Sequence, residues 1–428
     1  MSTAIRRPAP EKPGKVLTPR ERTVRSDRRL GAITMLLRLP QVMAPLGLLT
    51  LVAVSSSSAW TAALSSASLC LGIAVSGVGV AALANARWRL WALVAFSLIQ
   101  GIILWVLSRA QVTEIPVSWD AVSALAPFFV AGVVMTPMGL AARLRWASVL
   151  RAQDRSQAFP AAMRRESVNE GLATVLGAAL TGLLAVTMGP AVVLRFAAVW
   201  TVLITAAFVL HSSARCPRAD MPLWSWRRPR GAPGRSRAVF RLSHGLIYGV
   251  AALNALMGAV LGCLVVYSVS LDSVETMGVI YALLGFGAAV GSSLAVRFRR
   301  RLSAENMWIL AATGALLASM LMSGPSGFVG YSLVLLALGL FSGPCLLCLH
   351  SSAGYVTAGS DFLGLVARMT VTSSIATALG LTLSAYLGVH FDDMTAAMVP
   401  MAAAMVLLAT ALIFNYTQRR SPGPRPRI

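Results

Sequence analysis

Long apolar runs divide the chain into two similar sets of segments. A run of ~20 residues with few charges is typical of a helix that crosses a bilayer, because such a helix spans the hydrocarbon core. The runs cover residues 40–60, 63–84, 90–108, 121–142, 163–188 and 191–211, and then 244–268, 276–296, 306–324, 328–350, 364–388 and 394–415. This pattern predicts an all-α polytopic membrane protein with twelve transmembrane helices.

One stretch of the sequence occurs twice. Residues 159–184 and 362–387 lie 203 positions apart and are identical at nine of 26 positions. The same offset also pairs Arg38 with Arg241. Internal repeats of this kind indicate one structural unit used twice. The sequence therefore predicts two pseudo-symmetric six-helix bundles.

Composition agrees with this prediction. Hydrophobic residues make up 57% of the chain and charged residues 12%, and the mean hydropathy is +0.72. A soluble domain carries about 25% charged residues, so the composition excludes that class and predicts a lipid bilayer as the surroundings. The net charge of +22 comes from arginines between the apolar runs rather than on one face or tail. We therefore expect no nucleic-acid partner.

Arginine gathers in every second loop. Loops rich in arginine mark the cytoplasmic side of a membrane protein. The arginine-rich segments are the N-terminal arm, 87–89, 143–155, the central linker, 297–301 and 419–420. The intervening loops hold acidic residues instead and include a single arginine, Arg109. We predict a multi-pass protein of the cell membrane with both termini in the cytoplasm.

The same features divide the chain into five parts. Residues 1–30 combine proline with arginine and cannot bury a core, so we expect a disordered basic cytoplasmic arm. The predicted parts are this arm, an N-terminal bundle at 31–211, a cytoplasmic linker at 212–240, a C-terminal bundle at 241–416 and a cytoplasmic tail at 417–428.

This organisation resembles the major facilitator superfamily (MFS) of secondary transporters. The family's signature between helices two and three, G-x-L-A-D-R-x-G-R-R, is matched by residues 81–89, where Asn85 replaces the aspartate. The second-half counterpart, 294–301, keeps the arginines and also lacks the acid. Residues 177–182 resemble an exporter motif, G-P-x-x-G-G, without its proline. The resemblance implies alternating access around a central cavity.

The predicted function is secondary active transport, more specifically export of a moderately hydrophobic small molecule or metabolite by proton antiport. A small-molecule importer and a non-transporting sensor or assembly partner of the same fold are the alternatives. The sequence contains no phosphate-binding loop and no serine, histidine and acid cluster, so we expect neither ATP-driven export nor an enzyme. We also expect no cofactor and a monomer.

A metal site is not expected either. Cys345, Cys348 and His350 form C-x-x-C-x-H within an apolar run. A structural zinc site needs four ligands, and the sequence offers no second ligand pair here. We interpret these three residues as packing residues.

Polar residues at helical spacing form a stripe in each copy of the repeat. The candidates for the substrate cavity are Thr174 and Thr181 in the first copy, Ser373, Thr377 and Ser384 in the second, and Asn254 in the predicted helix 244–268. Transporters built from repeats place such groups at a central site. Small and hydroxyl residues also occur at helix packing interfaces, so both interpretations stay open.

Two residues are candidates for proton coupling. Glu170 lies about two turns inside a predicted membrane helix, where a carboxylate is costly and usually functional. The alternative is an interfacial ion pair with Arg164 or Arg165. His244 titrates near neutral pH when unperturbed. Glu166, nearer the helix start, is expected at the membrane interface.

The repeat-matched arginines Arg165 and Arg368 are candidates for a cytoplasmic gate. Each stands at the predicted start of a repeat helix, where its guanidinium could bond helix C-terminal carbonyls. Arginines that reach the lipid headgroups are the alternative. Arg38 and its counterpart Arg241 are expected at the interface, and Arg38 is not predicted to belong to a site.

Overall fold

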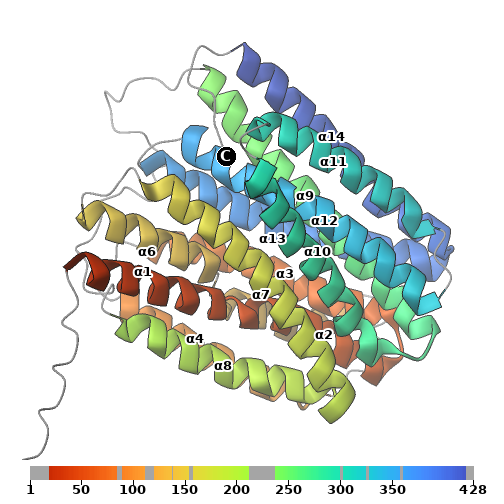
Figure 1. Ribbon diagram of the computed structural model, residues 1–428. Helices are drawn as coiled ribbons and strands as arrows, with labels where there is room; N and C mark the ends of the chain where they lie inside the picture. Colours follow the sequence, from red (N-terminus) through yellow and green to blue (C-terminus); the bar gives the residue numbers. More distant parts are fainter. Residues whose placement is uncertain are drawn as a thin grey trace, which may run out of the picture.

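The computed structural model describes residues 19–83, 89–110, 120–136, 138–153, 158–211, 237–298, 302–323, 327–356 and 360–420, which are almost entirely helical (Figure 1). The first half contains α1 Pro19–Leu36, α2 Leu39–Ser56, α3 Ala59–Leu83, α4 Arg89–Leu107, α5 Asp120–Val134, α6 Met138–Ala152, α7 Phe159–Met188 and α8 Pro190–Leu210. The second half contains α9 Arg237–Ser270, η3 Val274–Thr276, α10 Met277–Phe298, α11 Ala304–Met320, η4 Leu321–Ser323, α12 Gly327–Val356, α13 Ser360–His390 and α14 Asp393–Arg419.

Twelve segments of the described chain are long and apolar enough to cross a membrane. α1 and α2 together form the first, Asp27–Ser56, and α5 and α6 together form the fourth, Val122–Leu150. Each of the other ten is centred on a run predicted from the sequence. The prediction of an all-α membrane protein with twelve spans is confirmed, and an even number of spans puts the start of α1 and the end of α14 on the same side.

The first and fourth spans reach further than predicted. α1 begins at Pro19, inside the stretch expected as a disordered arm, and residues 1–18 lie outside the described part. α6 continues past residue 142 because apolar side chains such as Trp146 and Val149 remain buried beyond it. Arg143 and Arg145, expected in a loop, are therefore buried helix residues.

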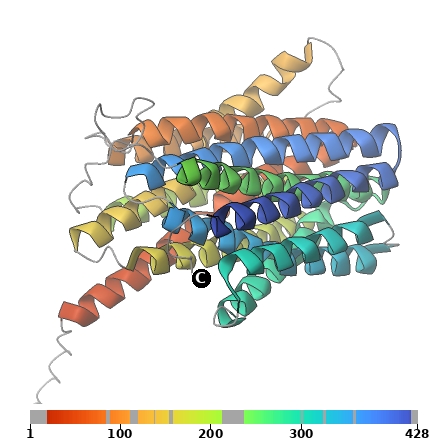
Figure 2. The same cartoon turned by 90° about the horizontal axis from the view of Figure 1, so that it is seen from above.

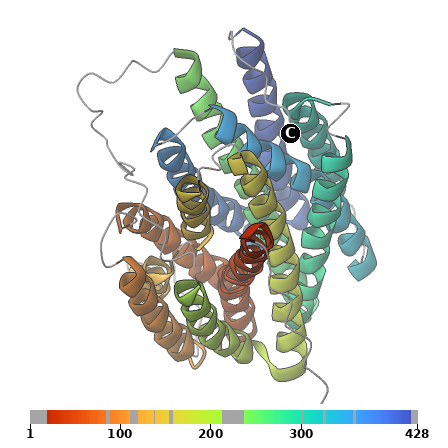
Figure 3. The same cartoon turned by 60° about the vertical axis from the view of Figure 1, so that its left-hand side comes forward.

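The two halves lie side by side. Figures 1 and 3 show the helices of the first half, red to yellow-green, on one side and those of the second half, green to blue, on the other. Figure 2 shows most helices running roughly along one common direction. α7 packs against α10 and α3 packs against α13, so these two pairs join the halves.

Several predicted features fall outside the described residues. These are the linker residues 212–236, the tail residues 421–428, and parts of both signature segments, 84–88 and 299–301. The boundaries of the two predicted bundles stay predictions.

Glycines let helix backbones approach one another. A Cβ on Gly380 of α13 would lie 2.1 Å from the carbonyl oxygen of Ala255 in α9, and one on Gly72 of α3 would lie 2.2 Å from that of Phe129 in α5. Small residues are needed where membrane helices pack this closely. These glycines therefore fix the arrangement within each half.

Hydroxyl and carboxylate caps define two helix starts. Ser303 accepts a hydrogen bond from the Asn306 amide at α11, and Asp392 accepts one of 2.7 Å from the Thr395 amide at α14. Such caps satisfy amides that lack a partner within the helix. The bonds from Thr395 also hold the pKa of Asp392, which precedes the membrane span, below its usual value.

Candidate functional site

A cavity of about 350 Å³ lies between the two halves. Helices of both halves line it: α2, α3, α6 and α7 from the first, and α9, α10, α12 and α13 from the second. Its size falls in the range of small-molecule sites. Its polar lining residues include Arg38, Gln41, Arg143, Glu170, Thr174, Asn254, Ser342, His350, Thr370, Ser373, Ser374 and Thr377.

The cavity lies near the middle of the spans and extends toward the side on which α1 starts and α14 ends, which we call the terminal side. α2 and α7 start on that side; the cavity residues 41–46 lie early in α2, whereas 170–174 lie near the middle of α7. α12 ends there, and its cavity residues, 342–350, lie in its second half. Glu170 keeps 35% of its side chain exposed, so protein atoms do not enclose this carboxylate completely.

The other end of the interface is closed. Cβ atoms on Gly182 of α7 and Gly278 of α10 would lie 2.3 Å and 2.4 Å from backbone nitrogens of the opposite helix, so the two backbones touch. Trp60 of α3 packs edge-on against Tyr386 of α13 with ring centroids 5.5 Å apart, and His390 lies 6.2 Å away. The two halves are therefore in contact at the end of the interface that lies away from the terminal side.

An ion pair stands in the cavity wall. Arg143 Nη2 of α6 donates to Glu170 Oε2 of α7 at 2.5 Å. Arg143 is 6% exposed in its side chain, whereas Glu170 is partly open to the cavity. A carboxylate that is paired with a fixed cation and is also open to the cavity can take up a proton, and it then no longer holds the cation by charge. The interfacial alternative, a pair with Arg164 or Arg165, does not describe this geometry.

A second ion pair is fully buried beside the first. Arg38 Nη1 donates to Glu166 Oε2, and Glu166 Oε1 accepts from Thr34 Oγ1 at 2.7 Å and from Trp146 Nε1 at 2.6 Å. Glu166 is 0% exposed and Arg38 is 3% exposed. Both were expected at the membrane interface. The structure differs because the first span starts at Asp27, which places Arg38 well inside it.

Gly139 of α6 brings the two guanidinium groups to one place. A Cβ on Gly139 would lie 3.4 Å from Arg38 Nε, 3.7 Å from Arg38 Nη2 and 3.9 Å from Arg143 Nη1. Gly139 itself lines the cavity. Two positive groups therefore flank the same point of the wall, and a glycine keeps that point free of a side chain.

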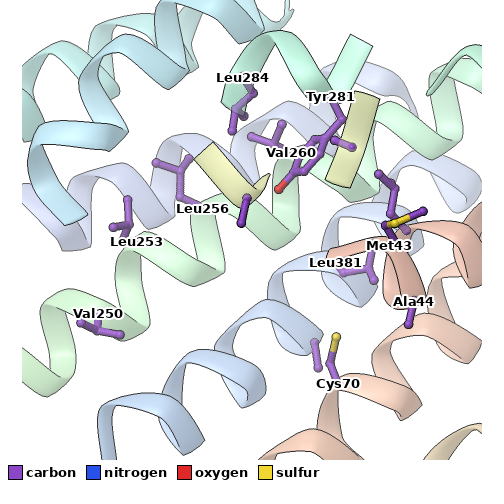
Figure 4. Packing of buried hydrophobic residues seen from close by; sticks show 14 of the residues in the cluster. Met43, Ala44, Cys70, Val250, Leu253, Leu256, Val260, Tyr281, Leu284 and Leu381 are labelled. Carbon is purple, nitrogen blue, oxygen red and sulfur yellow. The ribbon is translucent and has the colours of Figure 1, made fainter. Parts of the chain in front are cut away.

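The rest of the wall is mainly apolar. Val250 and Leu253 of α9 and Tyr281 and Leu284 of α10 line the cavity. Figure 4 shows them among the buried hydrophobic side chains, with Cys70 of α3 in the same cluster. The arginine and glutamate side chains of the wall thus come from the first half, whereas the second half supplies apolar side chains together with hydroxyl groups, Asn254 and His350.

Comparisons with known proteins agree with this architecture. No protein-family model matches the chain, and no curated protein matches it in sequence. Many solved structures match its fold, among them the crystal structure of the human organic anion transporter MFSD10 (TETRAN), with a TM-score of 0.63 and 15% identity over 91% of this chain and 99% of that one. The chain has the major facilitator superfamily fold. At this identity the likeness shows the fold alone.

Within the MFS fold, four of the predicted cavity residues line the central cavity: Thr174, Asn254, Ser373 and Thr377. Each donates a hydrogen bond to a carbonyl oxygen of its own helix; the Thr174 hydroxyl reaches Glu170 O at 3.0 Å and the Asn254 amide reaches Val250 O at 2.9 Å. Each of the three hydroxyl groups thus has its donor paired within its own helix, and the Asn254 amide has one of its two donors paired in the same way.

Two predicted cavity residues lie elsewhere. Thr181 is fully buried and donates to Gly177 O at 2.8 Å. Ser384 is also fully buried and contacts Cys263 Sγ at 3.0 Å. Neither lines the cavity, and both pack between helices, which was the alternative interpretation of the polar stripe.

The remaining predicted residues are also placed outside the cavity. His244 packs against Phe240, with ring centroids 4.1 Å apart, on the outer surface of α9. Arg165 is exposed, and Arg368 Nε donates to Gly364 O of its own helix at 3.0 Å. The role of these two arginines as a gate stays a prediction.

Sequence reasoning missed three charged or titratable cavity residues, Arg38, Arg143 and His350. Arg38 and Arg143 were assigned outside the membrane because their helices were expected to be shorter. Apolar residues that continue after Arg143, such as Leu144 and Trp146, were the available signal. His350 lines the cavity beside the buried Cys348, and the described residues contain no group of three metal-binding side chains.

Proposed function

We propose that the chain is a secondary active transporter that works by alternating access. One arrangement supports the proposal: a central cavity lined by both halves, with the halves in contact through Gly182 and Gly278 at the end away from the terminal side. Repeat-built transporters bind substrate at such a site and rock one half against the other. With the termini in the cytoplasm, this would be the inward-facing state.

Glu170 and Arg143 form the coupling site in this proposal. A proton on Glu170 removes the charge that holds Arg143, so loading a proton changes both side chains at once. The charged or titratable groups near Glu170 are Arg143, Arg38 and His350, and Glu166 neutralises Arg38 behind them. Changes in this cluster would alter contacts between α6, α7 and α12, which belong to different halves.

The direction and sign of transport stay predictions from the sequence. Export of a moderately hydrophobic compound by proton antiport requires that substrate and proton compete, as a cationic substrate would compete for Glu170. A substrate that binds together with the proton would give cotransport. A non-transporting sensor or assembly partner would share the fold and would not need to move.

Spin-label distances test alternating access without a known substrate. One label pair, Ser55→Cys with Glu275→Cys, joins the halves at the closed end, and another, Gln153→Cys with Arg297→Cys, joins them on the terminal side; all four positions are exposed. Cys216 is replaced by serine, and the other four cysteines are buried. In liposomes at varied pH, one distance should lengthen while the other shortens.

The Glu170→Gln variant supplies the test of coupling. It keeps the shape and hydrogen bonding of the side chain but cannot take up a proton, so the distance changes with pH should disappear. His350→Gln removes the other titratable group of this cluster, so a comparison of the two variants shows which of the two groups carries the pH response. Distances that stay fixed at every pH in the unmodified chain would support the non-transporting alternative.

A further inference from the structure

One hydrogen-bond donor in the cavity wall has no partner. Arg38 Nη2 is buried and makes no hydrogen bond, although Nη1 of the same guanidinium is paired with Glu166. Among the described residues that line the cavity, it is the one side-chain polar atom left buried and unpartnered. A buried donor without an acceptor carries its full desolvation cost. A ligand that offers an acceptor here removes that cost.

Glu166 does not supply the missing acceptor. Its two oxygens accept from Arg38 Nη1, Thr34 and Trp146, and neither is bonded to Arg38 Nη2. Arg143 Nη1 lies on the same side of Gly139 as Arg38 Nη2, and these two atoms would be 3.9 Å and 3.7 Å from a Cβ on Gly139. An acceptor placed over Gly139 therefore lies within reach of two guanidinium groups. Two such groups match a carboxylate in charge and in geometry.

The apolar part of the cavity defines the rest of the ligand. Leu253, Met257, Tyr281 and Leu284 line it without a charged side chain. We infer that the cavity binds an amphipathic organic anion, with its acid group over Gly139 between Arg38 and Arg143 and its apolar body against α9 and α10. The role of this anion as the transported substrate rests on the proposed function.

An anionic head also sets the sign of coupling. The head would lie near the Glu170 carboxylate, which it repels while Glu170 is ionised. A proton on Glu170 removes that repulsion and leaves Arg143 to the ligand, so proton and anion load together. A cationic ligand would instead compete with the proton for Glu170 and give antiport. Such a ligand offers no acceptor to the donor on Arg38.

Three probes that share one ring system test the inference. They are 1-naphthoate, its neutral analogue 1-naphthamide, and the cationic 1-naphthylmethylammonium. Binding to the purified full-length chain is measured by calorimetry. The unmodified chain should bind naphthoate at least about tenfold more tightly than either analogue, which is the size of a charged hydrogen bond.

Variants assign the preference to Arg38. Arg38→Gln combined with Glu166→Gln removes both charges and keeps the site neutral, and it should abolish the preference for naphthoate. Glu166→Gln alone leaves Arg38 without its competing carboxylate, so naphthoate should bind as tightly or more tightly. A purely structural ion pair predicts no change in preference in either variant. Size-exclusion chromatography shows whether each variant is folded.

Two glycines and a second arginine give matched controls. Gly139→Ala places a methyl group where the acid should lie and should weaken naphthoate binding, whereas Gly79→Ala, which meets no atom within 4 Å, should not. Arg195→Gln removes an arginine that contacts Ser108 outside the cavity and should also leave binding unchanged. Equal affinity for naphthoate and naphthamide, or no naphthoate binding at millimolar concentration, would overturn the inference.

The two proposals fail separately. An Arg38-dependent preference for naphthoate together with fixed spin-label distances would keep the anion site and remove the transport role. Distances that move without any preference among the three probes would keep transport and remove the anion.

Discussion

The two halves supply the same positions of the cavity wall with different chemistry. An offset of 203 residues relates cavity-lining positions in the fourth and tenth spans and in the fifth and eleventh. The pairs are Gly139 with Ser342, Arg143 with Leu346, Glu170 with Ser373 and Thr174 with Thr377. The repeat thus fixes where the wall lies. At these positions charged residues occur in the first half alone, so one side of the cavity is charged and the other is neutral.

The first and seventh spans differ in the same sense. Arg38 and Gln41 line the cavity, whereas their counterparts at the same offset, Arg241 and His244, lie outside it and Arg241 is exposed. Related positions can therefore face the cavity in one half and the surroundings in the other. Sequence similarity between repeats predicts the scaffold better than it predicts the site.

The substitution with the largest expected effect acts on the charge difference between the two halves. Arg38→Gln leaves the fully buried Glu166 without its cation, and removing one partner of a buried ion pair costs about 3–5 kcal/mol. We expect a strong loss of folded protein, measured as a lower midpoint of thermal unfolding in detergent. Adding Glu166→Gln should restore most of the stability, because no unpaired charge then remains.

Arg241→Gln is the control in the second half. Arg241 is exposed, so the same chemical change should alter the free energy of unfolding by less than about 0.5 kcal/mol. Equal losses of stability for Arg38→Gln and Arg241→Gln would mean that the two repeat-matched arginines are equivalent. The two halves would then not differ at this position.

A middle-sized effect concerns the repeat-matched glycines. A Cβ on Gly380 would lie 2.1 Å from a backbone oxygen of Ala255, whereas one on Gly177 would meet the side chain of Val42 at 2.9 Å. A backbone cannot move as easily as a side chain, so Gly380→Ala should cost about 1–3 kcal/mol or more. Gly177→Ala should cost less, since helix propensity returns up to about 1 kcal/mol.

Thermal unfolding of both glycine variants measures this difference. A larger loss for Gly177→Ala would show that α7 and α2 pack as tightly as α13 and α9. The halves would then differ in charge alone.

The number and order of the membrane spans could be predicted from the sequence because membrane length and apolar composition are local properties. Glu170 could be singled out for the same reason, since a carboxylate inside an apolar run is conspicuous. Arg38 and Arg143 could not, because their assignment depended on where a helix begins or ends. An arginine near the end of a span is interpreted as interfacial when its partner is not known. The structure identifies the partners as Glu166 for Arg38 and Glu170 for Arg143.

The sequence also could not show which polar side chains line the cavity and which already have hydrogen-bond partners between helices. Thr174 and Thr181 have the same residue type on the same helix, yet one lines the cavity and the other packs between helices. Helical periodicity gives the direction of a side chain but not what lies in front of it. That depends on the neighbouring helices, and the unpartnered Nη2 of Arg38 became visible only after all its neighbours were placed.

The smallest expected effect tests His244, the second residue predicted for proton coupling. Coupling requires a group whose access to water changes sides when the halves move. His244 Nδ1 lies 2.8 Å from Phe240 O of its own helix, and its ring contacts Phe240 and Tyr248, which are 54% and 58% exposed. This surface of α9 faces away from the cavity, so rocking of the halves should leave its surroundings as they are. His244→Gln should therefore keep the pH-dependent change in spin-label distances, with a shift in stability below about 0.5 kcal/mol.

Gln41→Ala, its counterpart, loses a 2.8 Å bond to Thr136 O and should cost about 1 kcal/mol. A pH response that vanishes in His244→Gln while Glu170 is intact would move the proton site to the second half.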